Sequence, residues 1–224
     1  MSDKPIDHRT RVGIERREKM RRRLVESAFK VFSEKGVDAS VIDDVKKEAG
    51  VSRGTFYNYF KTNNELLAAV GSDLSNELIN CIESIVGDYD DPIKRLSTGL
   101  RLFLRTAEKY PLLAQFFWRA GFNSISTDHL MFIYLPKHID AGIKSGEIKS
   151  KDIMTALEVL AGISLSAMFA FSNRKPGEGY PEEMVKHILL GLGIPKRKIT
   201  SCISIELPEI SFPEDSLLTR SHRS

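Results

Sequence analysis

Apolar residues recur every three or four positions along most of the chain, which is the spacing of one face of an α-helix. The first run of this kind predicts a helix over residues 14–35. Gly36 then ends the helix, because glycine readily adopts the left-handed conformation found at helix C-termini. Residues 1–13 show no apolar repeat, so we expect them to form a flexible arm.

Two short helices should follow. Ser40 can cap the first of them, which ends at Gly50, and the second begins only two residues later. Because the connection is so short, the two helices must cross at a sharp angle. The second helix is predicted over residues 53–60, with Phe56 and Phe60 one turn apart on its inner face.

The remainder of the chain predicts six further helices and, before residue 199, no strand pattern of comparable strength. Thr62 and Glu65 have the spacing of a capping box and begin a long helix that reaches residue 86. The other helices are expected over residues 92–110, 111–122, 128–144, 150–173 and 181–192. The tail from residue 196 is left open, because residues 199–205 could extend as a strand while the proline-interrupted rest has the character of a flexible segment.

Charge is unevenly distributed along the chain, whose net charge is +3. Residues 1–61 hold 15 Lys/Arg against 10 Asp/Glu, whereas the rest holds 18 against 20. Eight of the basic residues lie between Arg9 and Arg23. The N-terminal part is therefore the candidate for an anionic partner, although runs of charge also occur on solvated helix faces.

Several classes of protein fit this sequence poorly. The HExxH, P-loop and GxSxG motifs are absent, so no catalytic residue, cofactor or metal site is predicted. Cys81 and Cys202 are too few and too far apart for a disulfide scaffold, and the N-terminus is charged rather than apolar, which favours a cytoplasmic protein. The most apolar stretch, residues 153–171, is interrupted by Glu158 and is interpreted as a helix buried in protein rather than a membrane span.

The predicted helix at residues 53–60 carries side chains suited to DNA. Its open side holds Arg53, Gly54, Thr55, Tyr57, Asn58 and Tyr59. Arginine pairs with guanine and asparagine with adenine in the major groove, whereas hydroxyl groups and Lys61 suit phosphates. Gly54 lets the backbone approach either DNA or the preceding helix, and these two interpretations weigh equally.

The stretch from Ser40 to Leu66, SVIDDVKKEAGVSRGTFYNYFKTNNEL, closely resembles the helix-turn-helix signature of tetracycline-repressor-like (TetR family) transcriptional regulators. The specific elements are AGVSRGTFYNYF and the downstream NEL, and the detailed resemblance covers about residues 15–70. The resemblance implies DNA contacts by Ser40, Arg53, Thr55, Tyr57, Tyr59 and Lys61. Asn63 departs from the family, which commonly has a lysine there, so a phosphate contact at this point should be weaker or absent.

The resemblance also implies an all-α fold in which an N-terminal three-helix helix-turn-helix domain is joined by a long helix to a larger C-terminal helical domain for ligand binding and dimerisation. The expected parts are a flexible arm, a DNA-binding domain, a ligand-binding and dimerisation domain and a C-terminal tail of uncertain structure, at residues 1–13, 14–62, 63–195 and 196–224. Such proteins generally act as dimers.

Aromatic and methionine side chains gather in the central helices and form the predicted lining of an apolar ligand pocket. The set is Phe103, Phe116, Phe117, Trp118, Phe122, Met131, Phe132, Tyr134, Met168 and Phe169. Polar groups that could orient a ligand are Gln115, Arg119, Asn123 and His138. For any single one of these residues, an ordinary place in the core is the competing interpretation.

Small residues in the helix at 150–173 would allow another helix to approach closely, and with apolar residues of the last predicted helix they form the predicted dimer interface. The interface set is Ala161, Gly162, Ser166, Ala170, Val185, Ile188, Leu189 and Leu192.

Together these features predict a sequence-specific DNA-binding regulator. As a dimer it would read a palindromic double-stranded operator, with half-sites about one DNA turn (~34 Å) apart. A small apolar or aromatic effector would release this repressor by displacing the long fourth helix, provided that the effector binds the two states with different affinity. The alternatives are a ligand-independent or activating regulator and, less favoured, a helical enzyme.

Overall fold

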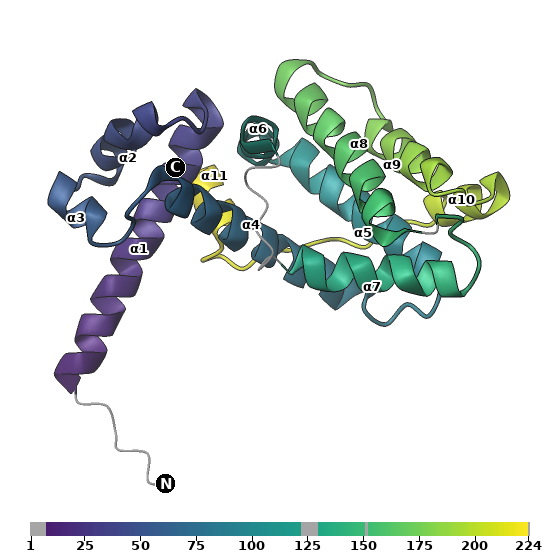
Figure 1. Ribbon diagram of the computed structural model, residues 1–224, viewed down its shortest axis with the longest axis horizontal. Coiled ribbons are helices and arrows are strands. Elements are labelled where there is room, and N and C mark those ends of the chain that lie inside the picture. The colour runs from purple at the N-terminus through teal and green to yellow at the C-terminus, as the bar shows by residue number, and fades with distance from the viewer. Residues whose placement is uncertain (1–7, 122–129, 151, 224) are drawn as a thin grey trace, which may run out of the picture.

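The computed structural model describes residues 8–121, 130–150 and 152–223, and every regular element in these ranges is a helix. The helices form a small N-terminal domain (residues 8–62) and a larger C-terminal domain (residues 63–203), which Figure 1 shows side by side. The predicted all-α class is confirmed.

Helix α1 (His8–Lys35) begins six residues earlier than its apolar pattern indicates. The prediction that residues 8–13 belong to a flexible arm is therefore wrong. The pattern missed these turns because they bury no face of the helix. They are helical through local propensity and through pairs such as Arg11 and Glu15, whose Nε and Oε1 atoms are 3.7 Å apart.

The middle of the N-terminal domain contains the short 3-10 helix η1 (Ala39–Val41), α2 (Ile42–Ala49) and α3 (Arg53–Tyr57). Gly50 ends α2 in the left-handed conformation, with φ 61° and ψ 40°. Ser52 caps α3 by accepting a hydrogen bond of 3.1 Å from the Thr55 amide. The regular helix ends at Tyr57 rather than at the predicted Phe60. The amides of Tyr59 and Phe60 still donate to the Phe56 carbonyl, so a hydrogen-bonded turn follows the helix.

Helix α4 (Asn63–Val86) is continuous for 24 residues, which is about 36 Å. Thr62 and Glu65 form the expected capping pair: the Thr62 hydroxyl accepts from the Glu65 amide at 3.1 Å, and the Glu65 carboxylate accepts from the Lys61 amide at 2.7 Å. The helix packs against α1 of the N-terminal domain and against α5 and α7 of the C-terminal domain, so it links the two (Figure 1).

The C-terminal domain is built around α5 (Pro92–Lys109), which packs against α4, α7 (Met131–Lys144), α8 (Ile153–Asn173) and α9 (Tyr180–Gly191). Helix α6 (Pro111–Ala120) lies against both α8 and α1. The rings of Phe29 on α1 and Phe116 on α6 meet edge to face at 5.8 Å, so apolar packing joins the two domains.

The end of the chain is folded, and the strand considered for residues 199–205 is wrong. Residues 196–203 form helix α10 (Lys196–Ile203), in which Ile199 and Cys202 share the buried face. Tertiary packing of that face decides the conformation, because the same residues also suit a strand.

The following segment, residues 204–223, returns to the N-terminal domain, and we call it the C-terminal strap. It ends in α11 (Leu217–Arg223), which packs against α4 and α1 (Figure 1). Glu77 of α4 accepts hydrogen bonds from the Leu217 amide at 2.8 Å, and Arg220 pairs with Glu26 of α1 at 3.2 Å. The strap therefore ties α1 to α4 at the junction of the domains.

Candidate DNA-binding surface and effector cavity

The outer face of α3 carries the side chains that the sequence assigned to DNA. Arg53, Gly54 and Asn58 are exposed, while Thr55 and Tyr57 are half-buried at the edge of the domain core. Beneath them Phe56 is fully buried and Phe60 is 4% exposed, as the apolar spacing predicted. The face that remains open is polar and carries hydrogen-bond donors.

Two local contacts arrange this face. The Arg53 guanidinium lies 5.7 Å from the centre of the Tyr57 ring, which is within the range of a cation–π contact. The Lys61 ammonium donates to the Tyr57 carbonyl at 2.6 Å. Ser40, on η1, is also exposed, and Tyr59 is half-buried against the core. All eight predicted DNA-binding residues thus lie on α3, on the turn after it or on η1.

Asn63 stands where TetR-family proteins commonly have a lysine, and its side chain has a structural role. It is 9% exposed, and its side-chain amide donates a 2.6 Å hydrogen bond to the carbonyl of Val37, in the loop after α1. The bond joins the start of α4 to that loop. Buried in this way, the side chain is not available to DNA.

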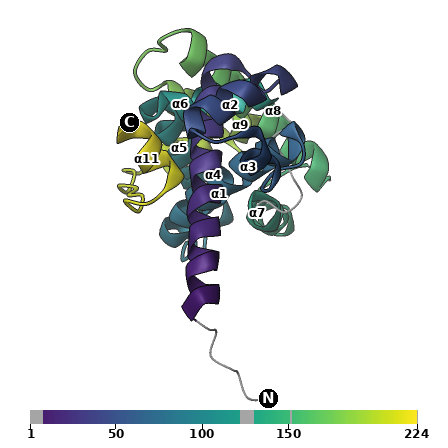
Figure 2. The ribbon, with the colours of Figure 1, turned by 90° about the vertical axis from the view of Figure 1, so that its left-hand side faces the viewer.

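The first turns of α1 project beyond the N-terminal domain, as Figure 2 shows clearly. They expose Arg11, Arg16, Arg17 and Lys19 to solvent. A projecting, basic helix beside a helix-turn-helix suits contact with phosphates that flank the recognised bases.

Replacing both Arg16 and Arg17 with alanine is therefore expected to weaken binding to any DNA sequence by a similar factor. Each lost phosphate contact should lower the slope of log affinity against log salt by roughly 0.9. Fluorescence anisotropy over a salt series would measure both quantities. The matched control removes Lys196 and Arg197, an exposed basic pair on α10. Equal slopes for the two double variants would contradict a role for α1.

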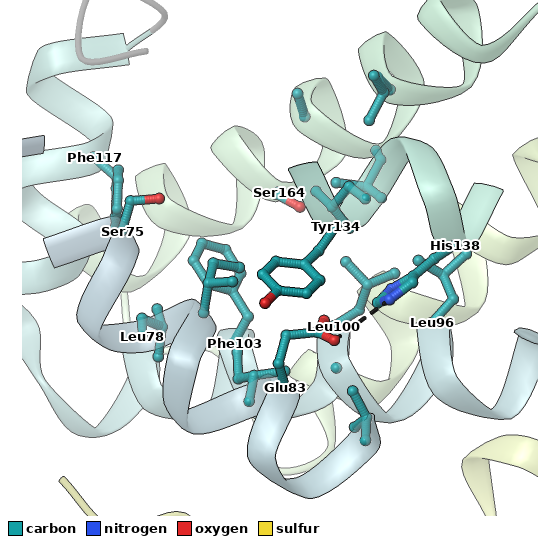
Figure 3. A pocket seen from close by; sticks show the side chains of 18 of the residues that line it. Ser75, Leu78, Glu83, Leu96, Leu100, Phe103, Phe117, Tyr134, His138 and Ser164 are labelled. Carbon is teal, nitrogen blue, oxygen red and sulfur yellow. Dashed lines mark ion pairs between the residues drawn. The ribbon is translucent and has the colours of Figure 1, made fainter. Parts of the chain in front are cut away.

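A cavity of about 160 Å³ lies in the C-terminal domain between α4, α5, α7 and α8 (Figure 3). Most of its wall is apolar and includes Leu78, Ile82, Val86, Leu96, Leu100, Phe103, Phe117, Leu157, Leu160 and Met168. A cavity with such walls suits a small organic molecule, which the hydrophobic effect would hold there.

A few polar groups interrupt the apolar wall. Figure 3 shows Glu83 and His138 facing each other, with the Tyr134 ring beside them. The Glu83 carboxylate and His138 Nε2 are 3.5 Å apart, which is an ion-pair distance only if the imidazole is protonated. Burial lowers the pKa of His138 to about 4, so the imidazole is neutral at pH 7. Burial also raises the pKa of Glu83.

The hydroxyl of Ser164, on α8, is a further polar group at the cavity. Serine in a helix commonly donates to the carbonyl four residues earlier. Among the residues that the structure describes, however, the buried Ser164 Oγ has no hydrogen-bond partner. The Nε atom of Arg95, another lining residue, is also buried without a partner from the described part of the chain.

The cavity includes only some of the predicted pocket residues. Phe103, Phe117, Tyr134 and Met168 line it, as does His138. Phe116 does not, because it fills the interface with α1. Trp118 and Phe169 do not line it either: their rings meet at 4.6 Å on the outer surface, where they are 39% and 42% exposed. Phe122 and Asn123 lie outside the described residues, as do the side chains of Met131 and Phe132.

The predicted interface residues divide in the same way. Gly162 and Ser166 lie exposed on α8, whereas Ala161 lines the cavity and Ala170 is fully buried. The other four predicted interface residues lie in α9 or directly after it. They are buried inside the subunit and cannot contact a partner. They are Val185, Ile188, Leu189 and Leu192, each at most 1% exposed. Their apolar spacing reflects packing of α9 within the subunit rather than between subunits.

Sequence reasoning missed Glu83, Arg95 and Ser164 as cavity residues. A signal for Glu83 was present, because Ile79, Glu83 and Val86 follow one another at intervals of four and three on one helical face. A carboxylate on an otherwise apolar face marks either the edge of that face or a polar group turned toward a cavity.

Helix α8 is long and apolar enough, by length and composition alone, to cross a membrane, and it is the one such helix in the described ranges. In the structure it packs against α6 and α9. Only 33% of its most apolar window is buried, so part of an apolar helix remains uncovered in the single subunit.

These features define an all-helical protein with a helix-turn-helix near its N-terminus. Residues 24–70 match the model of the family described as bacterial regulatory proteins, tetR family. Over these residues the chain is therefore similar to the TetR family of transcriptional regulators.

Individual relatives extend this comparison. YvdT of Bacillus subtilis (strain 168), an HTH-type transcriptional regulator, is 38% identical over 69 residues, which are 30% of this chain and 36% of YvdT. The chain thus spans about a third of the length of that relative. The structure of RolR bound to resorcinol is 26% identical, with a TM-score of 0.66, and the match covers 88% of this chain and all of that one.

A more distant structure shares the fold alone. FadR of B. subtilis, bound to stearoyl-CoA, is 18% identical, with a TM-score of 0.61 over 75% of this chain and 97% of that one. The same helical arrangement therefore accommodates ligands of very different size.

Proposed function

We propose that the protein is a cytoplasmic repressor that binds a palindromic operator as a homodimer and leaves it when a small organic effector enters the cavity. The observation that carries this proposal is the path of α4. At its start Leu66 and Val70 are fully buried against the N-terminal domain, while Leu78, Ile82 and Val86 line the cavity. One rigid element therefore touches both the DNA-reading part and the effector.

The path of α4 suggests how binding is transmitted. An effector that fits the cavity best when α4 is displaced favours that position, because a ligand shifts an equilibrium by its difference in affinity for the two states. Since α4 is continuous from Asn63 to Val86, displacement at the cavity moves its other end. In a dimer this changes the separation of the two α3 helices and removes their fit to half-sites one turn apart.

The uncovered face of α8 supports a dimer. On α8, Met154 is 58% exposed and Phe169 is 42% exposed, and the Phe169 ring meets that of Trp118 on α6, which is 39% exposed. A Cβ atom added at Gly162 would meet no atom within 4 Å, so a partner helix has room to approach. Exposed apolar surface of this extent generally marks a contact with another protein chain. A second copy of α8 and its neighbour α9 is the proposed partner.

The function is tested with DNA from upstream of the protein's own gene. We expect saturable, salt-dependent binding that exceeds binding to random DNA of equal length. Changing Asn58 to alanine should weaken the specific complex by at least about tenfold, because a paired asparagine discriminates adenine by about 1–3 kcal/mol. Asn80, exposed on α4 and remote from α3, supplies the matched Asn→Ala control. Equal affinity for upstream and random DNA would contradict the proposed function.

A further inference from the structure

We propose that the effector is a neutral compound of one ring that carries a hydroxyl group and donates a hydrogen bond from it to Glu83, as a phenol does. This inference rests on the proposed function only in calling the bound molecule an effector. The cavity and its chemistry are observed independently of DNA.

The size of the cavity sets the first limit. An engineered protein cavity of roughly 150 Å³ binds benzene, so a volume of about 160 Å³ suits one aromatic ring with small substituents. The rings of Phe103 and Phe117, whose centroids are 5.9 Å apart, give one side of the wall an aromatic surface. A long acyl chain would exceed this volume.

Glu83 sets the second requirement, because it is a half-buried acceptor to which no described residue donates a hydrogen bond. Its side chain is 15% exposed, and no hydrogen bond to its carboxylate comes from the described residues. His138 is too far away at 3.5 Å to donate a good hydrogen bond. A carboxylate that is largely shielded from water gains from a donor, so a ligand that supplies one gains more than it would from a neutral acceptor.

Ser164 offers a second polar contact across the cavity. Its side chain is 7% exposed and its hydroxyl has no partner among the described residues. Figure 3 places Ser164 on the other side of the Tyr134 ring from Glu83. A ring with two hydroxyl groups could satisfy both residues, one from α4 and one from α8.

Charge excludes the ionic relatives of such a ring. A benzoate would bring a second carboxylate beside Glu83, and like charges in a buried site repel strongly. A benzylammonium would lie near Arg95, whose charge already acts on both Glu83 and His138. The neutral hydroxyl compound alone gives Glu83 a donor without adding a buried charge.

The test compares five probes by isothermal titration calorimetry at pH 8 without DNA. Phenol, toluene, benzoate and benzylamine share one ring and differ in charge and donor, and 4-octylphenol adds length. We expect phenol to bind at least about tenfold more tightly than each of the others, because a hydrogen bond to a charged group contributes about 1.5–3 kcal/mol. Tighter binding of benzoate, benzylamine or 4-octylphenol, or binding of phenol no tighter than toluene, overturns the proposal.

A variant identifies the acceptor. Glu83→Gln keeps the size of the side chain but removes the charge, so the preference for phenol over toluene should fall to less than about threefold while toluene binding is retained. Glu206→Gln, in the exposed strap, is the matched control. An unchanged preference in Glu83→Gln would show that Glu83 is not the acceptor.

The two hypotheses fail separately. If phenol binds with the expected preference but the protein does not distinguish upstream DNA from random DNA, the proposed function is wrong and the ligand class stands. If upstream DNA is bound specifically and phenol is not preferred, the ligand class is wrong and the DNA-binding function stands.

Discussion

Changing Phe56 to alanine is expected to lower the free energy of unfolding by about 3–5 kcal/mol and to abolish specific DNA binding. Phe56 is fully buried, and its ring centre lies 5.3 Å from that of Tyr57 and 6.3 Å from that of Phe60. The cavity left by the substitution would lie directly beneath the face of α3 that we propose to meet DNA. Because the N-terminal domain is small, this loss is a large part of the stability available to it.

Hydrogen exchange measured residue by residue tests this prediction. Protection should fall over residues 39–62 and persist in α5, and phenol binding to the cavity should be retained. Ile14→Ala, at an exposed position of α1 with 51% accessibility, should change stability by less than about 0.5 kcal/mol. Equal loss of protection in both domains would mean that the two unfold as one unit, contrary to this prediction.

Replacing both Leu217 and Leu218 with aspartate is expected to detach the C-terminal strap. The two leucines are 2% and 4% exposed, and burying a leucine contributes about 1.5–3 kcal/mol. Two carboxylates cannot occupy that space without partners, and they would lie close to Glu77 of α4, which accepts the amide hydrogen bond of Leu217. The detached strap regains conformational entropy, which offsets part of this contribution. The expected loss in the free energy of unfolding is therefore about 3 kcal/mol, a fall of roughly 6–12 °C in the melting temperature.

Limited proteolysis shows whether detachment is the cause of that loss. Cleavage after residue 203 should be rapid in the aspartate variant, and the fragment from residue 1 to residue 203 should stay folded. Ser204→Asp with Ser211→Asp adds the same two charges at exposed positions of the strap and should leave both the melting temperature and the cleavage rate unchanged. A strap that remains protected despite buried aspartates would show that the leucines do not hold it.

Strong local signals explain why the N-terminal domain could be predicted from the sequence. Gly50 adopts the left-handed conformation, Ser52 and Thr62 cap their helices, and Phe56 faces inward, as expected. Each of these features depends on residues within about one helical turn, so a short stretch of sequence determines it. The helical class and the resemblance to the TetR family follow from the same local patterns.

The effector cavity and the subunit surface depend on contacts between distant helices. An apolar repeat shows that one face of a helix is buried, but not what covers it. For that reason the apolar pattern predicts a pocket position for Phe116, which packs on α1, and an interface position for Val185, which packs inside the subunit. The same ambiguity explains why Trp118 and Phe169 are predicted to line the pocket although both are exposed.

The sequence by itself determined most of the helices, their caps and the exposed polar face of α3, because these arise from interactions between neighbours in the chain. Only the tertiary structure decided that Glu83 and His138 meet across one cavity, and that residues 204–223 return to α1 and α4. Such contacts join residues far apart in sequence, and their energies depend on how whole helices pack. A local pattern does not encode that arrangement.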